Sequence, residues 1–156
     1  MTTRAEDVEE CYRLHADALS RFAVSLTGTG AGDDVLATAV LSVLESNTEQ
    51  IDDLRAYLYR AVHNAARKHW RTAGRRAARE RQLWAATQYE MPEVDLGVAS
   101  ALASMSVMQR AVVHLAYWED LTTAQIAARL GVREGTVKQH RSRAHRRLGE
   151  VLDDHR

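Results

Sequence analysis

The sequence predicts an all-α protein built as two small helical domains joined by a linker. Apolar residues recur at spacings of three and four over most of the 156 residues, which is the period of an amphipathic helix. No stretch alternates polar and apolar residues with the period of two that a half-buried strand requires. The periodicity fades between Gly74 and Gly97. We therefore expect domains at residues 1–73 and 98–156, with a linker at 74–97.

Two helices open the first domain. One apolar stripe runs through residues 8–26 and stops at the glycine-rich stretch 28–32, which we interpret as a flexible turn. Asp33 is the expected N-cap of the second helix, whose stripe covers residues 36–44 and ends before Ser46.

The third helix begins at Leu54, because Asp52 and Asp53 suit the electropositive end of a helix. Its stripe stays in register to Trp70. Beyond it, the only proline, Pro92, lies in a stretch with no clear period, where at most one helical turn is expected.

The second domain is predicted to consist of short helices with capping residues at their starts. After a short helix ending near Met105, Ser106 is placed to cap one helix and either Thr122 or Thr123 to cap the next. Gly131 supplies the positive φ of a tight turn between two helices, and the last helix begins near Glu134. Two helices around such a turn form a helix-turn-helix pattern.

The formal net charge of zero conceals a strong segregation of charge. Residues 1–50 hold three basic and nine acidic side chains. The stretch 55–81 holds nine basic residues and one acid, and 129–147 holds seven and one. Two separate basic stretches indicate a polyanionic partner, although the overall pI near 7.1 does not.

The last helix carries residue types that read base edges in the major groove. The candidates for base contacts near its start are Arg133, Glu134, Thr136, Lys138 and Gln139. Cations farther along would mostly meet phosphates, and these are Arg141, Arg143, Arg146 and Arg147.

The third helix offers a second surface for nucleic acid, on which aromatic rings lie between cations. Rings of this kind stack on unpaired bases while the cations hold phosphates. The residues off its apolar stripe are Arg60, His63, Asn64, Arg67, Lys68 and Arg71, and the rings interleaved with them are His69 and Trp70. For Trp70, burial in the core is an equally good interpretation.

Catalysis, metal binding and cofactor binding find no support in the sequence. The seven histidines form no HExxH pattern, and no phosphate-binding glycine loop follows a strand. The one cysteine, Cys11, excludes an internal disulfide and a cysteine-based zinc site. No apolar run is long enough to insert in a membrane, and the acidic N-terminus is no signal peptide, so we expect a cytoplasmic protein.

These patterns together resemble the extracytoplasmic-function group of bacterial sigma factors. Residues 21–28, 33–34 and 57–71 are similar to sigma region two, and residues 108–122 and 131–138 are similar to region four. The two halves occur in the family's order and cover nearly the whole chain.

The resemblance implies a non-catalytic protein that binds the RNA polymerase core and directs it to promoters. Its partners would be the clamp of the largest polymerase subunit, the flap of the second largest, and promoter DNA. An anti-sigma factor is a further candidate partner. Carried over by position, the −35 duplex would be contacted by Arg133, Glu134, Thr136, Lys138, Gln139 and Arg143. The −10 strand would lie on Asn64, Arg67, Lys68, His69, Trp70 and Arg71. The polymerase surface would include Asp34, Ala37, Thr38 and Leu41.

Three departures from the family's usual residues occur. Ala37-Thr38 replace a Gln-Glu pair, which predicts weaker binding to the polymerase core. Lys68 replaces an Asp, which predicts altered reading of the −10 element. Arg141 replaces a Leu, and its stem can cover apolar surface while its head reaches a phosphate.

Two alternatives remain open from the sequence. Residues 136–140 also resemble the helix-turn-helix of a response-regulator output domain, although a receiver domain would alternate strands and helices. A diverged sigma-fold adaptor that binds polymerase or a regulator without reading promoters would fit the departures at Ala37, Thr38 and Lys68.

Overall fold

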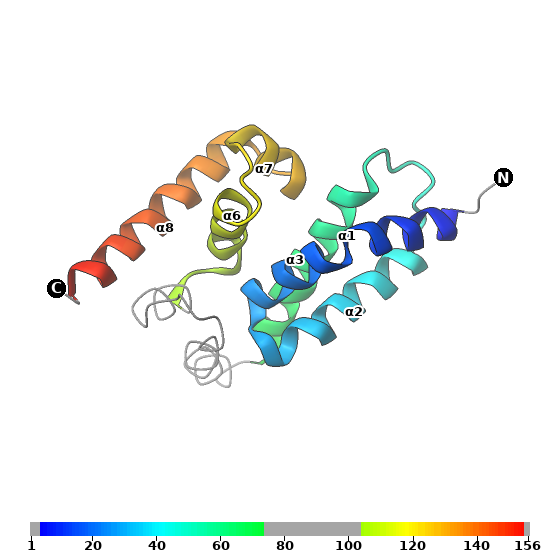
Figure 1. The fold of residues 1–156 in the computed structure, drawn as a ribbon, viewed down its shortest axis with the longest axis horizontal. Helices are drawn as coiled ribbons and strands as arrows, with labels where there is room; N and C mark the ends of the chain where they lie inside the picture. Colours follow the sequence, from blue (N-terminus) through cyan, green and yellow to red (C-terminus); the bar gives the residue numbers. More distant parts are fainter. Residues whose placement is uncertain (1–3, 74–103, 155–156) are drawn as a thin grey trace.

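The computed structural model describes residues 4–73 and 104–154, where all regular secondary structure is helical (Figure 1). The helices are α1 (Arg4–Thr27), α2 (Thr29–Glu45), α3 (Leu54–Thr72), α6 (Val107–Tyr117), α7 (Thr123–Leu130) and α8 (Glu134–Asp154). The expected all-α class is confirmed. The stretch 74–97, expected to be a linker, lies outside the described residues.

Helices α1, α2 and α3 pack side by side as a three-helix bundle (Figure 1). The turn between α1 and α2 is a single residue, Gly28, whose φ of 92° is costly for any residue with a Cβ. The amide of Gly32 already donates to the carbonyl of Gly28 at 3.0 Å. The flexible turn expected at 28–32 and the N-cap expected at Asp33 are therefore wrong, because the N-cap of α2 is Gly28, five residues earlier.

The start of α3 lies at Leu54 as expected, and Asp53 is its N-cap. The side chain of Asp53 accepts a hydrogen bond from the backbone amide of Ala56 at 2.9 Å. The loop before it is tied to the start of α1, since Arg4 Nε donates to the carbonyl of Thr48 at 2.9 Å. The bundle is thus closed at the end opposite Gly28.

Helices α6, α7 and α8 form the second half, and their boundaries are set by local side chains. Ser106 and Thr122 each form a complete capping box, with Gln109 and Gln125 respectively. Gly131 ends α7 in the left-handed conformation with φ 67°. The assignments of Ser106 and Gly131 made from the sequence are confirmed, and of the two candidates Thr122 and Thr123 the cap is Thr122.

Most buried apolar side chains of the two halves form one continuous cluster, and Met105, Val113 and Ala144 form a small second one. Phe22 of α1 is fully buried, with its ring centroid 5.0 Å from Tyr59 of α3 and 5.5 Å from His114 of α6. Burying a side chain of this size contributes about 1.5–3 kcal/mol. The two halves therefore pack against each other through apolar surface as well as polar contacts.

Candidate nucleic-acid and polymerase surfaces

The α7–α8 unit places a basic helix on the protein surface. The amide of Val132 donates to the carbonyl of Ala127 at 3.0 Å, which closes the turn through Gly131. Val137 is fully buried and holds the start of α8 against the rest of the domain. Because this face of α8 packs inward, residues on the opposite face of the helix point toward solvent.

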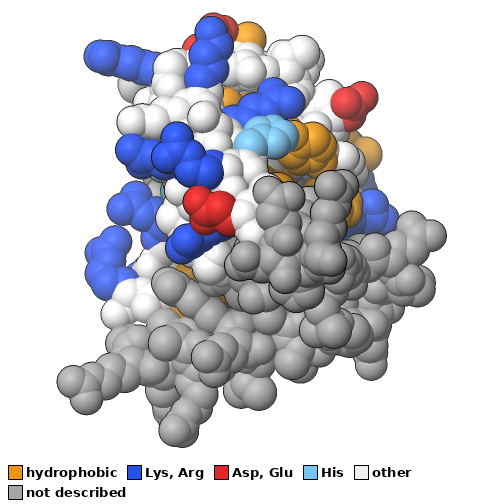
Figure 2. All heavy atoms as spheres, turned by 90° about the vertical axis from the view of Figure 1, so that its left-hand side faces the viewer, with side chains coloured by type: hydrophobic (Ala, Val, Ile, Leu, Met, Phe, Trp, Pro, Cys, Tyr) orange, Lys and Arg blue, Asp and Glu red, His pale blue; other side chains and the backbone are white. Residues whose placement is uncertain are grey.

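Most of the candidate DNA-contacting residues of this unit are exposed. They are Arg133, Glu134, Lys138, Gln139, Arg143, Arg146 and Arg147, whereas Thr136 and Arg141 are half-buried. The guanidinium of Arg141 lies 5.8 Å from the ring centroid of Tyr117 on α6. Figure 2 looks onto the side of the molecule where α8 lies in Figure 1, and Lys and Arg side chains gather along one edge of the described surface there.

The candidate residues of α3 divide into two groups. Asn64, Arg67, Lys68 and Arg71 are exposed, and His69 is half-buried. Trp70 is only 7% exposed, and its Nε1 donates to the carbonyl of Leu26 at 2.9 Å. Of the two interpretations of Trp70, burial in the core therefore describes this structure.

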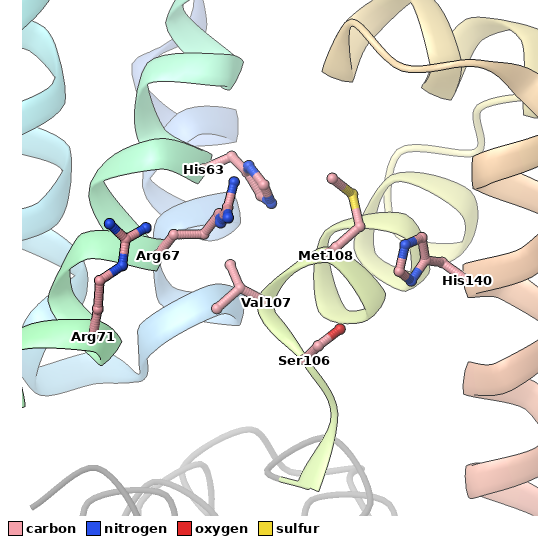
Figure 3. A pocket seen from close by; sticks show the side chains of 7 residues that line it. All are labelled: His63, Arg67, Arg71, Ser106, Val107, Met108 and His140. Atoms are coloured by element: carbon pink, nitrogen blue, oxygen red, sulfur yellow. The ribbon is translucent and has the colours of Figure 1, made fainter. Parts of the chain in front are cut away.

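A cleft of about 470 Å³ separates the basic face of α3 from α6 and α8. Its walls are His63, Arg67 and Arg71 on one side, and Ser106, Val107, Met108 and His140 on the other (Figure 3). Of the residues expected to bind DNA, Arg67 and Arg71 of the −10 set line this cleft, and none of the −35 set does.

The histidines of this region are held neutral by burial. Burial lowers the pKa of His63 to about 4, and the neighbouring Arg67 and His140 act in the same direction. Burial also lowers the pKa of His140, assisted by Arg143. Burial lowers the pKa of His114 on α6 to about 4, assisted by Arg21. Protons therefore do not supply the positive charge of the cleft near neutral pH; its arginines do.

The candidate polymerase-binding residues share one exposed face of α2. Asp34, Ala37, Thr38 and Leu41 follow helical spacing and are all exposed. Leu41 is 59% exposed, and Leu44, which the sequence pattern placed inward, is 37% exposed. Leu44 lies outside the core because the buried face of α2 is narrower than the sequence pattern and ends at Val43. The result is apolar surface beside acidic residues.

Sequence reasoning did not find the polar contacts that join the two halves. Tyr59 on α3 donates a hydrogen bond to Glu119, and Arg60 Nη2 donates to the carbonyl of Ala128 at 2.9 Å. Arg110 is 1% exposed, and its Nη1 donates to the carbonyl of Leu26 at 2.6 Å. The available clue was Arg110 on the apolar stripe of its helix, which predicts a buried charge without naming its partner.

The described residues contain neither a membrane-spanning helix nor a metal-binding cluster. No helix within 4–73 or 104–154 has the length and apolarity needed to span a bilayer. The same ranges contain no group of three or more His, Cys, Asp or Glu side chains placed to hold a metal ion.

Comparison with known proteins identifies both halves. The family profile described as Sigma-70 region 2 matches residues 11–76, and the profile described as Sigma-70, region 4 matches residues 96–148. The ECF RNA polymerase sigma factor SigL of Mycobacterium tuberculosis is 34% identical over 160 residues, which cover 92% of this chain and 87% of SigL. The chain belongs to the ECF RNA polymerase sigma factors. This sigma factor is also 32% identical to the RNA polymerase sigma-E factor of Streptomyces coelicolor, over 94% of this chain and 86% of that one.

A solved structure shares the fold of this sigma factor. The sigma factor RpoE of Bartonella quintana, crystallised in complex with the anti-sigma factor NepR, superposes with a TM-score of 0.67. The match covers 97% of this chain and 99% of RpoE at 22% sequence identity. The likeness extends over both helical halves.

Proposed function

We propose that this sigma factor binds the RNA polymerase core through α2 and directs it to promoters, with α8 reading the −35 duplex and α3 holding the −10 strand. The observation that carries the proposal is the order of two matched sigma regions on one chain, each presenting its own exposed basic helix. Transcription would place the protein in the cytoplasm. The sigma family is one of non-enzymatic initiation factors, so we propose no catalytic step.

On α8 the proposed division of labour is between base contacts and phosphate contacts. Exposed Lys138 and Gln139 near the start of the helix can form hydrogen bonds with base edges. Arg143, Arg146 and Arg147 lie farther along and would attract phosphates of any sequence. Arg141 is held near Tyr117, so its contribution to DNA affinity would be smaller.

On α3 the exposed edge formed by Asn64, Arg67, Lys68 and Arg71 would follow the backbone of a separated strand. Lys68 adds a positive charge where the family usually has an acid. We therefore propose stronger attraction for the strand and less discrimination among bases at this position.

For polymerase, the exposed face of α2 would meet the clamp, and the second half would meet the flap. The Ala37-Thr38 pair lacks the hydrogen-bonding groups of Gln-Glu, so we expect weak retention on core polymerase. In a pull-down, Ala37→Gln/Thr38→Glu should be retained more strongly than the wild type. Equal or weaker retention would show that these two positions do not set the affinity.

Run-off transcription with core polymerase tests the whole proposal. The wild type should start transcripts at a defined promoter. Replacement of the −35 base pairs that α8 is proposed to read should abolish these transcripts. Retention on polymerase without transcripts would instead identify a sigma-fold adaptor. The all-helical first half already argues against a response-regulator receiver, which contains strands.

We further propose that residues 1–73 and 98–156 are separate folding units and that 74–97 connects them. Limited proteolysis should then cut first between residues 75 and 95. First cuts within α3 would contradict this division.

A further inference from the structure

The cleft between α3 and α6 is lined by positive charge that no carboxylate offsets. Its described lining includes two arginines and two histidines but no Asp or Glu. Arg67 and Arg71 are exposed and lie one helical turn apart on α3, and neither forms an ion pair within the described residues. The cleft therefore favours an anion and disfavours a metal cation.

The opposite wall of this cleft is the N-terminus of α6. The capping box uses two amides of the first turn, since Gln109 donates to Ser106 Oγ and Ser106 donates to Gln109 Oε1, both at 3.1 Å. The amides of Val107 and Met108 have no partner within their helix, and both residues line the cleft. A helix N-terminus carries partial positive charge, so it adds to the attraction for an anion.

Two histidine nitrogens at the cleft are buried without a hydrogen-bond partner in the described part of the chain. They are Nε2 of His63 and Nδ1 of His140. His63 is 6% exposed, and its ring extends from α3 toward α6 with the guanidinium of Arg67 beside it (Figure 3). A buried unpaired nitrogen costs free energy. This cost is removed if the neutral His63 ring donates from Nε2 to an oxygen of a ligand that Arg67 also binds.

The size and the walls of the cleft indicate the class of ligand. Its volume of about 470 Å³ lies within the range of about 300–1,000 Å³ that is typical of small-molecule sites. Guanidinium groups and helix N-termini are both typical partners of phosphate. The side chains of Val107 and Met108 add an apolar wall on which a compact organic group can lie. A nucleic-acid strand needs a groove that extends over several nucleotides, so a small ligand fits this space better.

We propose that this cleft is a binding site for a small molecule that carries a phosphate monoester. The phosphate oxygens would accept hydrogen bonds from Arg67, Arg71, the amides of Val107 and Met108, and His63 Nε2. The organic part of the ligand would lie against the apolar wall. This site does not depend on the DNA contacts proposed for α3, because the ligand binds the free sigma factor.

Titration of the full chain with inorganic phosphate, at an ionic strength held constant with sodium chloride, tests the anion site. In ¹H–¹⁵N NMR spectra, the amide signals of Val107 and Met108 should shift and saturate. Arg71→Gln should weaken this binding about tenfold or more, the usual effect of losing a hydrogen bond to a charged group. Lys68→Gln removes the same charge from an exposed position of α3 outside the cleft, and should weaken binding less than about twofold.

A second pair of variants tests the part of His63. His63→Leu removes the donor from the cleft wall, whereas His63→Gln keeps an N–H group on a side chain of similar reach. His63→Leu should bind inorganic phosphate several-fold more weakly than the wild type, and His63→Gln should retain most of the affinity. Equal affinity in all three proteins would show that His63 does not contact the anion.

The class of ligand is tested with adenosine 5′-monophosphate, adenosine and a mixed-sequence single strand of about 12 nucleotides. Adenosine 5′-monophosphate should shift the same two amides and bind about threefold or more tightly than inorganic phosphate, because its rings can cover Val107 and Met108. Adenosine at the same concentrations should give no saturating shift of these amides.

Three results would overturn the proposal. Equal losses in Arg71→Gln and Lys68→Gln would mean that α3 attracts anions without a defined site. Equal affinities for adenosine 5′-monophosphate and inorganic phosphate would mean an anion site without room for an organic group. Shifts of both amides with the strand but not with adenosine 5′-monophosphate would assign the cleft to DNA. Run-off transcription does not require the small ligand, so a failure here and a failure of the proposed promoter function remain distinguishable.

Discussion

Helices α3 and α8 are both basic and both follow patterns expected of DNA-binding elements, but the fold uses them differently. On α8 the candidate base-reading residues Lys138 and Gln139 are exposed, and only one narrow face is buried through Val137. On α3 the charged edge faces a cleft, and Trp70 is buried. Similar composition thus gives one helix that is open on most faces and one that contributes both to the core, through Trp70, and to the wall of a cleft, through Arg67 and Arg71.

The largest effect is expected at the core that α3 shares with the second half. Phe22→Ala removes a fully buried ring that contacts both Tyr59 and His114. It should lower the free energy of unfolding by about 3–5 kcal/mol in urea denaturation. Leu14→Ala, at a site 71% exposed, should change it by less than about 0.5 kcal/mol. A loss below about 1 kcal/mol for Phe22→Ala would mean that this core does not support the fold.

The next effect concerns the buried histidine of α3. The pKa of His63 is about 4 in the folded chain and about 6.5 when unfolded, so the unfolded chain takes up more protons between these values. The stability is fully present above pH 6.5 and is lost as the pH falls toward 4. Between pH 7 and 5, His63 should account for a loss of about 2 kcal/mol.

Urea denaturation of His63→Gln at pH 7 and pH 5 measures this contribution. The variant should lose about 2 kcal/mol less than the wild type over this interval. Asn64→Gln, a non-titrating change at the adjacent exposed position, should behave as the wild type does. An unchanged pH dependence in His63→Gln would show that this ring is accessible to protons in the folded chain.

On α8 the comparison is between base reading and phosphate attraction. Gln139→Ala should reduce discrimination at one promoter position by about 1–3 kcal/mol and leave the salt dependence nearly unchanged. Arg147→Ala should weaken binding to all duplexes alike and reduce the slope of log affinity against log salt by about 0.9. Titrations on matched and mismatched −35 duplexes at several salt concentrations distinguish them. An even loss across sequences in both variants would show that α8 does not read bases.

The smallest effect is expected where the two compared regions touch. Gly131 has φ 67°, and a Cβ there would lie 2.7 Å from Arg60 Nε. Gly131→Ala should therefore destabilise the chain by about 1 kcal/mol or somewhat more. Gly149→Ala on α8 meets no atom within 4 Å and should stabilise it by up to about 1 kcal/mol. Thermal unfolding compares the two, and equal shifts would mean that neither φ nor Arg60 constrains Gly131.

The sequence predicts those features that depend on interactions between residues close together in the chain. The caps at Asp53, Ser106 and Thr122 and the glycine at 131 depend on hydrogen bonds over three or four residues, so their spacing is visible in the chain. The start of α2 was missed because glycine is a poor helix former, and only packing against α1 makes residues 30–32 helical.

The contacts between the halves could not be predicted in the same way. Arg60 and Arg110 bind backbone carbonyls 68 and 84 residues away. Every residue has a backbone carbonyl, so the sequence does not show which one an arginine binds. The exposure of the basic residues of α8 follows from the apolar stripe of that helix alone. The burial of Trp70 depends on which face of α3 packs against the rest of the protein. Local pattern therefore proposes the site residues, while tertiary packing decides that Trp70 is buried and that Asn64, Arg67, Lys68 and Arg71 are exposed.

The separation of charge along the molecule gives it an electric dipole without a net charge. Residues 1–50 hold nine acids and three bases, and 129–147 holds one acid and seven bases. The start of α1 and the end of α8 lie at opposite ends of the long axis (Figure 1). A neutral dipole in the field of a polyanion experiences a torque before it experiences much attraction, and salt screens both beyond about 10 Å. Near DNA the molecule should turn so that the helix-turn-helix leads and the acidic bundle trails, which orients the first encounter without accelerating it over long distances.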